Sequence, residues 1–346
     1  MNIFYNKPQR RLRTFWRILF LGLMDFVFQL LLGVGLGFGA IFVMMAGGNF
    51  TGLLDDPVLL TTQISAIMLD NPWMRIFNTM AGVIAILAAL GIAAKVLDKR
   101  PFKDFGFHFN RAWWRDLVFG MLLGAVLMLF IFGLELTLGW VKITSGPAVN
   151  TSATGFWFSM LVALLTFIGV AISEESFSRA YLLRNLAEGF NGRKFSPQMA
   201  LWIGYLISAV VFGLLHLGNP NTTWVSTLNL MVAGLFLGLG FILTGELALP
   251  IGLHLTWNLF QGNVFGFPVS GTQAGVSFLT IEQGGPTALT GGAFGPEAGL
   301  IGLVAMGLGC LAILWWVWRT TGSVKLAERL AQYEPPVKPA EAPEAH

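Results

Sequence analysis

Three short groups of polar residues interrupt the apolar stretches of this 346-residue chain. In chain order they are Glu174-Glu175-Ser-Phe-Ser-Arg179, Phe212-Gly-Leu-Leu-His216 and His254-Leu-Thr-Trp-Asn258. A carboxylate and an imidazole can exchange protons with a reacting group, and an imidazole one helical turn from a carboxamide can orient a water or stabilise an oxyanion. Each group also has a purely structural interpretation: a buried ion pair, a core histidine, and a polar contact between helices.

The spacing within and between these groups predicts on which helix face, and at what height, each side chain lies. Glu175 and Arg179 are four residues apart, so on a helix they share a face and can pair. Glu174 is turned by about 100° from Glu175, which leaves it free for chemistry. If one helix ends near Glu188 and the next begins near Gln198, Glu174 and His216 differ in height by only about 6 Å. An antiparallel hairpin would therefore bring this carboxylate and imidazole to a similar level.

The elements that position these residues are predicted to be transmembrane helices. The chain is 55% hydrophobic and 11% charged, with a mean hydropathy of +0.69, whereas soluble domains carry about 25% charged residues. This excludes a soluble globular enzyme and a disordered chain, and the single cysteine, Cys310, excludes a disulfide scaffold. Apolar runs of about 20 residues with scattered glycines indicate packed helices. We predict an all-α polytopic bundle with about eight spans, near 15–45, 74–94, 117–140, 156–186, 199–217, 224–244, 249–265 and 298–318.

The basic residues orient the predicted bundle. Of the 21 Lys and Arg residues, 18 lie in the N-terminal arm, in 95–115, in 184–194 and in the C-terminal tail, and only Arg75 and Lys142 fall in predicted outer loops. Cytoplasmic loops collect Lys and Arg. Both termini are therefore predicted to be cytoplasmic in a multi-pass protein of the plasma (inner) membrane, and the net charge of +3 indicates no nucleic-acid partner.

Composition divides the chain into four regions. Residues 1–150 form the N-terminal helices with a basic arm, 151–266 a core with the three motifs, 267–319 a Gly-rich outer loop with the last span, and 320–346 a disordered tail. Among the other ionisable residues, Asp25 and Glu135 are expected to be paired or interface-reaching structural groups, and Glu246 to be solvated.

Taken together and in this order, the three motifs resemble the CAAX protease and bacteriocin-processing family of membrane endopeptidases. The family pattern is Glu-Glu-x-x-x-Arg, Phe-x-x-x-His and His-x-x-x-Asn, and the similar region spans about Leu161–Phe265. The flanks FGLLHLGNP and LALPIGLHLTWN look like the family as well. This chain has Ser178 and Ala180 where many relatives have Phe and Gly, a departure that affects local packing more than chemistry.

The resemblance implies a role for each motif residue. Glu174 would activate a water with help from His216, His254 and Asn258 would polarise the scissile carbonyl and stabilise the oxyanion, and Glu175 and Arg179 would orient the motif. No cofactor is expected. Zinc held by Glu174, His216 and His254 is the alternative, although the chain has no His-Glu-x-x-His helix and asparagine is a poor zinc ligand.

The implied function is an intramembrane endopeptidase, with the bilayer and a membrane-associated or lipidated peptide as its partners. Hydrolysis needs water, so we expect a polar cavity that is open to the cytoplasm. A proton-coupled transporter is one alternative, but it predicts a two-fold hydropathy repeat that the sequence lacks. A non-catalytic immunity or scaffold protein of the same fold is the other.

Overall fold

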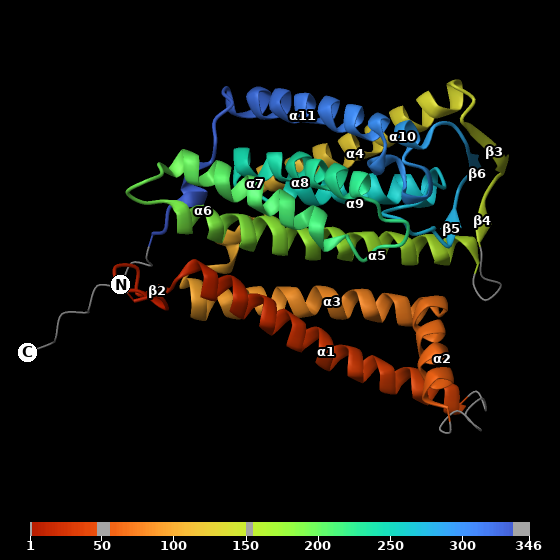
Figure 1. Ribbon diagram of the computed structural model, residues 1–346, viewed down its shortest axis with the longest axis horizontal. Helices are drawn as coiled ribbons and strands as arrows, with labels where there is room; N and C mark the ends of the chain where they lie inside the picture. Colours follow the sequence, from red (N-terminus) through yellow and green to blue (C-terminus); the bar gives the residue numbers. More distant parts are fainter. Residues whose placement is uncertain (1, 47–55, 150–154, 335–346) are drawn as a thin grey trace, which may run out of the picture.

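The protein is a bundle of long helices that run alongside one another (Figure 1). The computed structural model describes residues 2–46, 56–149 and 155–334. Seven helical segments within these residues are long and apolar enough to cross a membrane. The predicted all-α polytopic class is therefore confirmed, and the chain is a multi-pass membrane protein.

The long helices are joined mostly by short connections at the two ends of the bundle. They are α1 (Thr14–Ala46), α3 (Pro72–Ile92), α4 (Arg111–Thr137), α5 (Phe156–Glu175), α7 (Pro197–Leu215), α8 (Trp224–Thr244) and α11 (Leu300–Thr321). α3 continues through a π-helical segment, Ala93–Asp98, and α5 continues through another, Ser176–Leu183, into α6 (Arg184–Phe190). The α5–α6 rod of 35 residues is about 52 Å long, so it exceeds the ~30 Å hydrocarbon layer and its end protrudes.

One predicted span, 249–265, is not a long helix. It folds as α9 (Ala248–Leu259) followed by a π-helical turn, Phe260–Val264. Every residue from Ala248 to Trp257 is buried, because α4, α5 and α8 pack around α9. The segment is apolar because it lies inside the bundle, which is why it has the composition of a span without the length of one.

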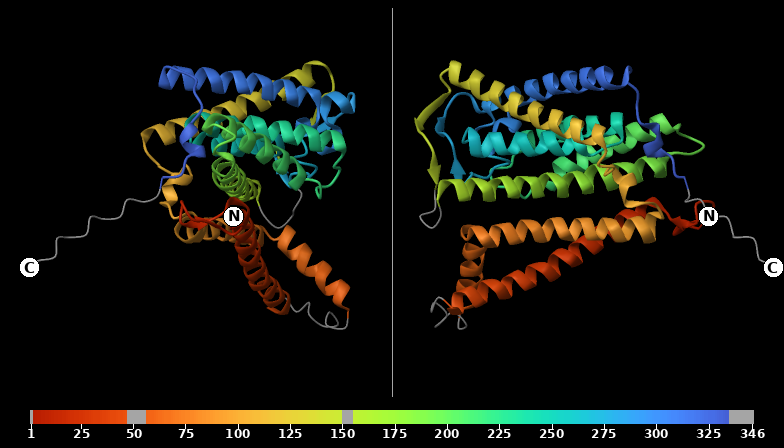
Figure 2. Two further views of the ribbon diagram at one scale, coloured as in Figure 1. Left: turned by 60° about the vertical axis from the view of Figure 1, so that its left-hand side comes forward. Right: turned by 180° about the vertical axis from the view of Figure 1, so that it is seen from behind.

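α1 and α3 form a layer beside α5, and the shorter α2 (Pro57–Asp70) lies across the end of that layer away from the termini (Figures 1 and 2). Asp56 caps α2 by accepting from the backbone N–H groups of Val58 and Leu59. Most large apolar side chains of α1 are exposed, as expected where a helix faces lipid. The layer therefore contacts the rest of the bundle mainly through α3 and α5.

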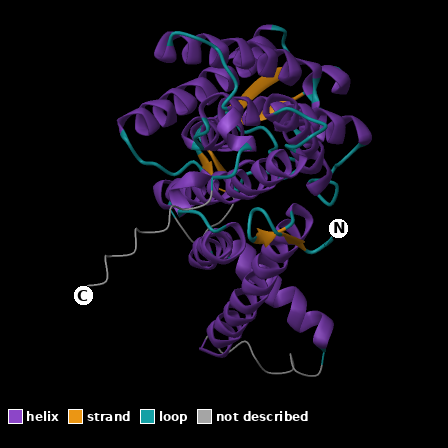
Figure 3. Ribbon diagram, turned by 90° about the vertical axis from the view of Figure 1, so that its left-hand side faces the viewer, coloured by secondary structure: helices purple, strands orange, loops and turns teal. Residues whose placement is uncertain are grey.

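Part of the region predicted as an outer loop is ordered. β3 (Val141–Ser145) pairs antiparallel with β6 (Thr280–Gln283), and β4 (Ala148–Val149) pairs with β5 (Val276–Ser277). A third pair, β1 (Tyr5–Asn6) and β2 (Arg11–Leu12), lies in the N-terminal arm (Figure 3). A short helix, α10 (Thr287–Thr290), precedes α11. The strands pair the loop with the α4–α5 connection, so the loop covers one end of the bundle.

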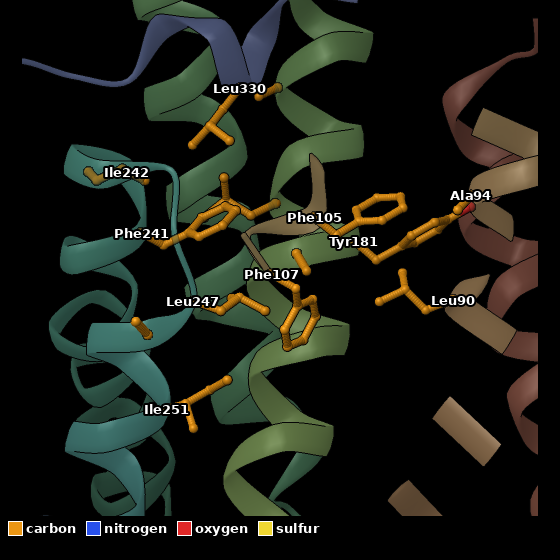
Figure 4. Packing of buried hydrophobic residues seen from close by; sticks show 14 of the residues in the cluster. Leu90, Ala94, Phe105, Phe107, Tyr181, Phe241, Ile242, Leu247, Ile251 and Leu330 are labelled. Carbon is orange, nitrogen blue, oxygen red and sulfur yellow. The ribbon is translucent and has the colours of Figure 1, made fainter. Parts of the chain in front are cut away.

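Residues 322–334, which the sequence places in a disordered tail, fold back onto the bundle. The Ala327 N–H donates to the carbonyl of Ile242 at 2.8 Å, and the side chains of Leu330 and Ala331 are buried. Figure 4 shows Leu330 directed at the apolar cluster that contains Phe105 and Phe241. This single apolar turn anchors an otherwise polar segment, and the remaining tail, 335–346, lies outside the described residues.

Candidate active site

The three motifs meet in the middle of the bundle. Glu174 lies in the last turn of α5, His216 caps the C-terminus of α7, and His254 lies in the middle of α9. Oε2 of Glu174 is 3.9 Å from Nε2 of His216 and 3.9 Å from Nε2 of His254. The prediction that Glu174 and His216 reach the same level is confirmed, and His254 joins them.

A buried ion pair supports this group from behind. Glu175 has no exposed surface, and Nε of Arg179 lies 3.1 Å from Oε2 of Glu175, as the spacing predicts. The Arg179 guanidinium also donates to the carbonyl of Gly234 at 3.0 Å. Oε1 of Glu175 is 2.8 Å from Nδ1 of His254. The pair therefore fixes the ring of His254. This contact between Glu175 of α5 and His254 of α9 was not predicted from the sequence.

The hydrogen-bond partners of both histidines determine which ring nitrogen faces Glu174. Nδ1 of His216 lies 2.8 Å from the carbonyl of Phe212, and Nδ1 of His254 faces the Glu175 carboxylate. Both partners can only accept, so each Nδ1 carries the hydrogen, and in the neutral ring Nε2 is an acceptor. Oε2 of Glu174 is buried and has no hydrogen-bond partner among the described residues. Three acceptor atoms thus converge on one point, which suits a water that donates hydrogen bonds.

Asn258 completes the predicted set. It lies one turn beyond His254, it lines the same cavity, and its carboxamide makes no side-chain hydrogen bond within the part of the chain that the structure describes. Its two N–H donors are therefore available to a bound molecule.

The cavity at this site has a volume of about 890 Å³. Its lining residues come from the middle of the bundle and from the end away from the termini, including the loop residues Val269, Ser270 and 272–275. The described segments 93–116, 184–200 and 240–250, at the terminus end, contribute none. The cavity therefore extends toward the end of the bundle away from the termini. The sequence instead predicts an opening on the cytoplasmic side, where it also places the termini.

The connection between α8 and α9 explains why His254 is deep although it follows Pro250 closely. Residues 247–249 have no exposed surface, and Gly106 and Arg329 contact this turn from outside. Together with the protruding α5–α6 rod, this sunken turn places all three motifs at one depth.

Sequence reasoning missed the contribution of α1 and α3 to the cavity. Asp25 and Gln29 of α1 and Arg75, Asn78 and Thr79 of α3 line it. Asp25, expected to be a structural group, accepts from Gln29 at 2.7 Å. One sequence signal could have revealed the cavity-lining face of α3. Its polar residues are spaced three and four apart, which places them on one face of an otherwise apolar helix.

Two other ionisable residues have side-chain partners within the fold. Glu135 is buried and accepts from Gln283 of β6 at 2.8 Å, which matches the paired structural role expected for it. Glu246 was expected to be solvated, but it lies 2.8 Å from His108 and 3.5 Å from Arg329. Its partners come from the segment before α4, which contains His108, and from the folded-back tail, which brings Arg329 to this turn.

The described residues contain no group of three or more His, Cys, Asp or Glu side chains placed to hold a metal ion. The zinc alternative therefore finds no support in this arrangement.

Comparison with known proteins agrees with the motif geometry. Residues 156–260 match the family model of the type II CAAX prenyl endopeptidase Rce1-like proteins. We call these residues, which are similar to those endopeptidases, the Rce1-like segment. The resemblance inferred from the three motifs is confirmed, and all six motif residues fall inside the Rce1-like segment. The match supports a CAAX-type intramembrane protease.

One relative is similar over most of the chain. The uncharacterized protein YyaK of Bacillus subtilis (strain 168) is 24% identical over 291 residues, which cover 83% of this chain and 89% of that protein. The similarity thus extends beyond the Rce1-like segment. No solved structure matches the chain.

Proposed function

We propose that the protein is an intramembrane endopeptidase in which Glu174 activates a water that hydrolyses a peptide bond of a membrane-associated peptide. One observation carries the proposal: Oε2 of Glu174 is buried, has no hydrogen-bond partner among the described residues, and lies 3.9 Å from Nε2 of both His216 and His254 in a cavity large enough for a peptide. The Rce1-like match of the same segment supports the reaction class.

The roles follow from which atoms can donate and accept. Glu174 takes a proton from the water while the water oxygen bonds to the scissile carbonyl carbon. His216 holds that water in place. The Asn258 amide donates to the oxyanion, and His254, whose ring the Glu175 contact fixes, accepts a hydrogen bond from the same water through Nε2. The carbon–nitrogen bond then breaks as Glu174 returns the proton to the leaving amine.

The direct test is Glu174→Gln, which keeps the shape of the side chain and removes the base. Peptides that accumulate in cells with this variant, identified by mass spectrometry, give the substrate for assays with purified protein. We expect cleavage to fall by about a thousand-fold or more, as is typical when a catalytic base is lost. Glu282→Gln, an exposed carboxylate on β6, is the matched control and should retain full activity. A wild-type rate in the Glu174→Gln protein would overturn the proposal.

Chelation separates the glutamate type, which we propose, from the metallo type. Activity that survives 1,10-phenanthroline, in protein with less than one metal ion per chain, supports the glutamate type. Activity that is lost on chelation and restored by zinc would instead assign Glu174, His216 and His254 as metal ligands.

A further inference from the structure

One face of α3 carries polar residues into the catalytic cavity. Arg75, Asn78, Thr79 and Gly82 all line it, at the spacing of one helical face. The opposite face is apolar and exposed, with Trp73, Phe77 and Ile84 among its residues. A membrane helix with this pattern faces lipid on one side and a polar space on the other. The helix lies outside the Rce1-like segment, so neither the three motifs nor the family match assigns it a role.

Arg75 is the most unusual residue of this face. It is the sole Lys or Arg among the described residues that line the cavity, and no described carboxylate lies within 4 Å of its guanidinium. The other ionisable residues that line the cavity are Asp25, Glu174, His216, His254 and Glu297. Arg75 lies in the first turn of α3, at the end of the bundle away from the termini. A guanidinium in the wall of a partly enclosed cavity is stabilised by an anionic partner, and the cavity is the space where such a partner would bind.

The distance between Arg75 and Glu174 suits one extended peptide. α3 and α5 run in the same direction (Figure 1), and they touch where Thr79 packs against Gly169. Arg75 lies four residues before this contact and Glu174 five residues after it, on the opposite side along the bundle axis. Nine helical residues correspond to about 13 Å, which an extended chain covers in about four residues.

We propose that Arg75 binds a carboxylate of the peptide substrate, about four residues from the bond that Glu174 hydrolyses. The carboxylate is either the free C-terminus or the side chain of Asp or Glu, since a guanidinium pairs with both in the same bidentate way. Arg75 is then a specificity residue, not a catalytic one. This inference rests on the proposed function of the same cavity.

The test is a binding measurement, so that it does not depend on cleavage. Glu174→Gln protein in lipid nanodiscs is titrated with a fluorescein-labelled peptide of Gly, Ala and Leu, and anisotropy is read. The peptide is used in three forms: with a free C-terminus, with a C-terminal amide, and as an amide with one Asp. The same titrations are repeated with Glu174→Gln protein that also carries Arg75→Gln, Arg75→Lys or Lys142→Gln. Lys142 is the matched control, because it is the other basic residue at this end and is exposed on β3.

We expect the free-acid peptide to bind about ten-fold or more tightly than the amide, as for a charge-assisted pair. Arg75→Gln should remove this preference, Arg75→Lys should keep part of it, and Lys142→Gln should keep all of it. Tight binding of the Asp amide assigns a side-chain carboxylate as well, and weak binding assigns the C-terminus alone.

Equal affinity for all three peptides, binding of none, or a preference that survives Arg75→Gln would overturn the assignment. The proposed function can fail independently of this assignment. If Glu174→Gln protein cleaves peptides at the wild-type rate, the role of Glu174 is wrong. If Arg75→Gln still abolishes the preference for the free-acid peptide, the carboxylate site stands.

Discussion

At the level of single residues, the site depends on one fully buried carboxylate in close contact with a guanidinium and an imidazole, and on a second carboxylate that faces the cavity. Glu175 is buried between Arg179 and His254, so its carboxylate holds these two neighbouring side chains. Glu174, the next residue, is 35% exposed and faces the cavity. The two side chains differ in role because the helix turns by about 100° between them.

A third carboxylate, Glu297, makes one wall of the cavity sensitive to pH. Its Oε1 accepts from the backbone N–H of Ser270 at 2.5 Å, Gln261 donates to its other oxygen, and the residue is 3% exposed. Burial raises the pKa of the Glu297 carboxyl to about 7, although these hydrogen bonds oppose the rise. The loop that contains Ser270 lines the cavity, so its attachment depends on this group.

The pKa of Glu297 gives a prediction for stability. Since the folded protein binds this proton more tightly than the unfolded chain, the contribution is fully present below pH ~4.5 and is lost as pH rises to about 7. The total change from this group is up to about 3 kcal/mol. We expect thermal unfolding midpoints in detergent to fall over this interval, and Glu297→Gln to reduce the fall. An identical pH dependence in wild type and variant would contradict this.

At the level of elements, the approach of α4 and α9 sets the position of His254 and Asn258. A Cβ atom on Gly124 of α4 would lie 2.6 Å from the carbonyl oxygen of Leu253 and 2.8 Å from the nitrogen of Trp257. Real atoms do not approach so closely, so any larger residue here must push the helices apart. The helix that carries two of the proposed site residues is thus held in place by a glycine on its neighbour.

Gly124→Ala should therefore displace α9. We expect a loss of about 1–3 kcal/mol in stability, as for other overpacked cores, together with lower kcat. The measurements are the thermal midpoint and the cleavage rate. Gly133→Ala on the same helix is the control, since nothing lies within 4 Å of its added Cβ, and it should leave both unchanged or raise stability slightly. Equal effects of the two substitutions would show that the close approach is not the cause.

The sequence predicted most of these elements, because span length and the spacing of Glu175, Arg179 and His216 are local properties. It could not predict that α9 is an interior helix, since an apolar segment looks the same in lipid and in a protein core. It also missed the cavity face of α3 and the contact between Glu175 and His254, because both depend on how distant helices pack.

At the level of the whole molecule, a buried ion cluster closes the terminus end. Glu188 of α6 lies within 3.3 Å of Arg11, Arg17, Arg100 and Arg184, which come from the N-terminal arm, α1, the residues after α3, and α6. The ring of Tyr333, in the folded-back tail, stacks 3.4 Å from the Arg11 guanidinium. Burial lowers the pKa of Arg11 to about 10, so it stays charged near neutral pH. The N-terminal arm and the folded-back tail are thus tied together at the end of the bundle where 17 of the 20 Lys and Arg residues that the structure describes lie.

This closure, together with the lining of the cavity, predicts the side from which substrate arrives. If the basic face is cytoplasmic, the cavity opens toward the opposite side of the membrane, where 269–275 and the start of α3 lie. Cysteine labelling in cells tests this, because Cys310→Ser removes the one native thiol. We expect a membrane-impermeant maleimide to label Gln273→Cys and Asn78→Cys in intact cells, and to label Lys194→Cys, at the terminus end, only after the cells are permeabilised. The reverse pattern would place the cavity mouth in the cytoplasm and would make the basic residues of this chain an exception to the usual charge rule. The expected pattern would instead mean that the peptides reaching Glu174 are presented from outside the cytoplasm.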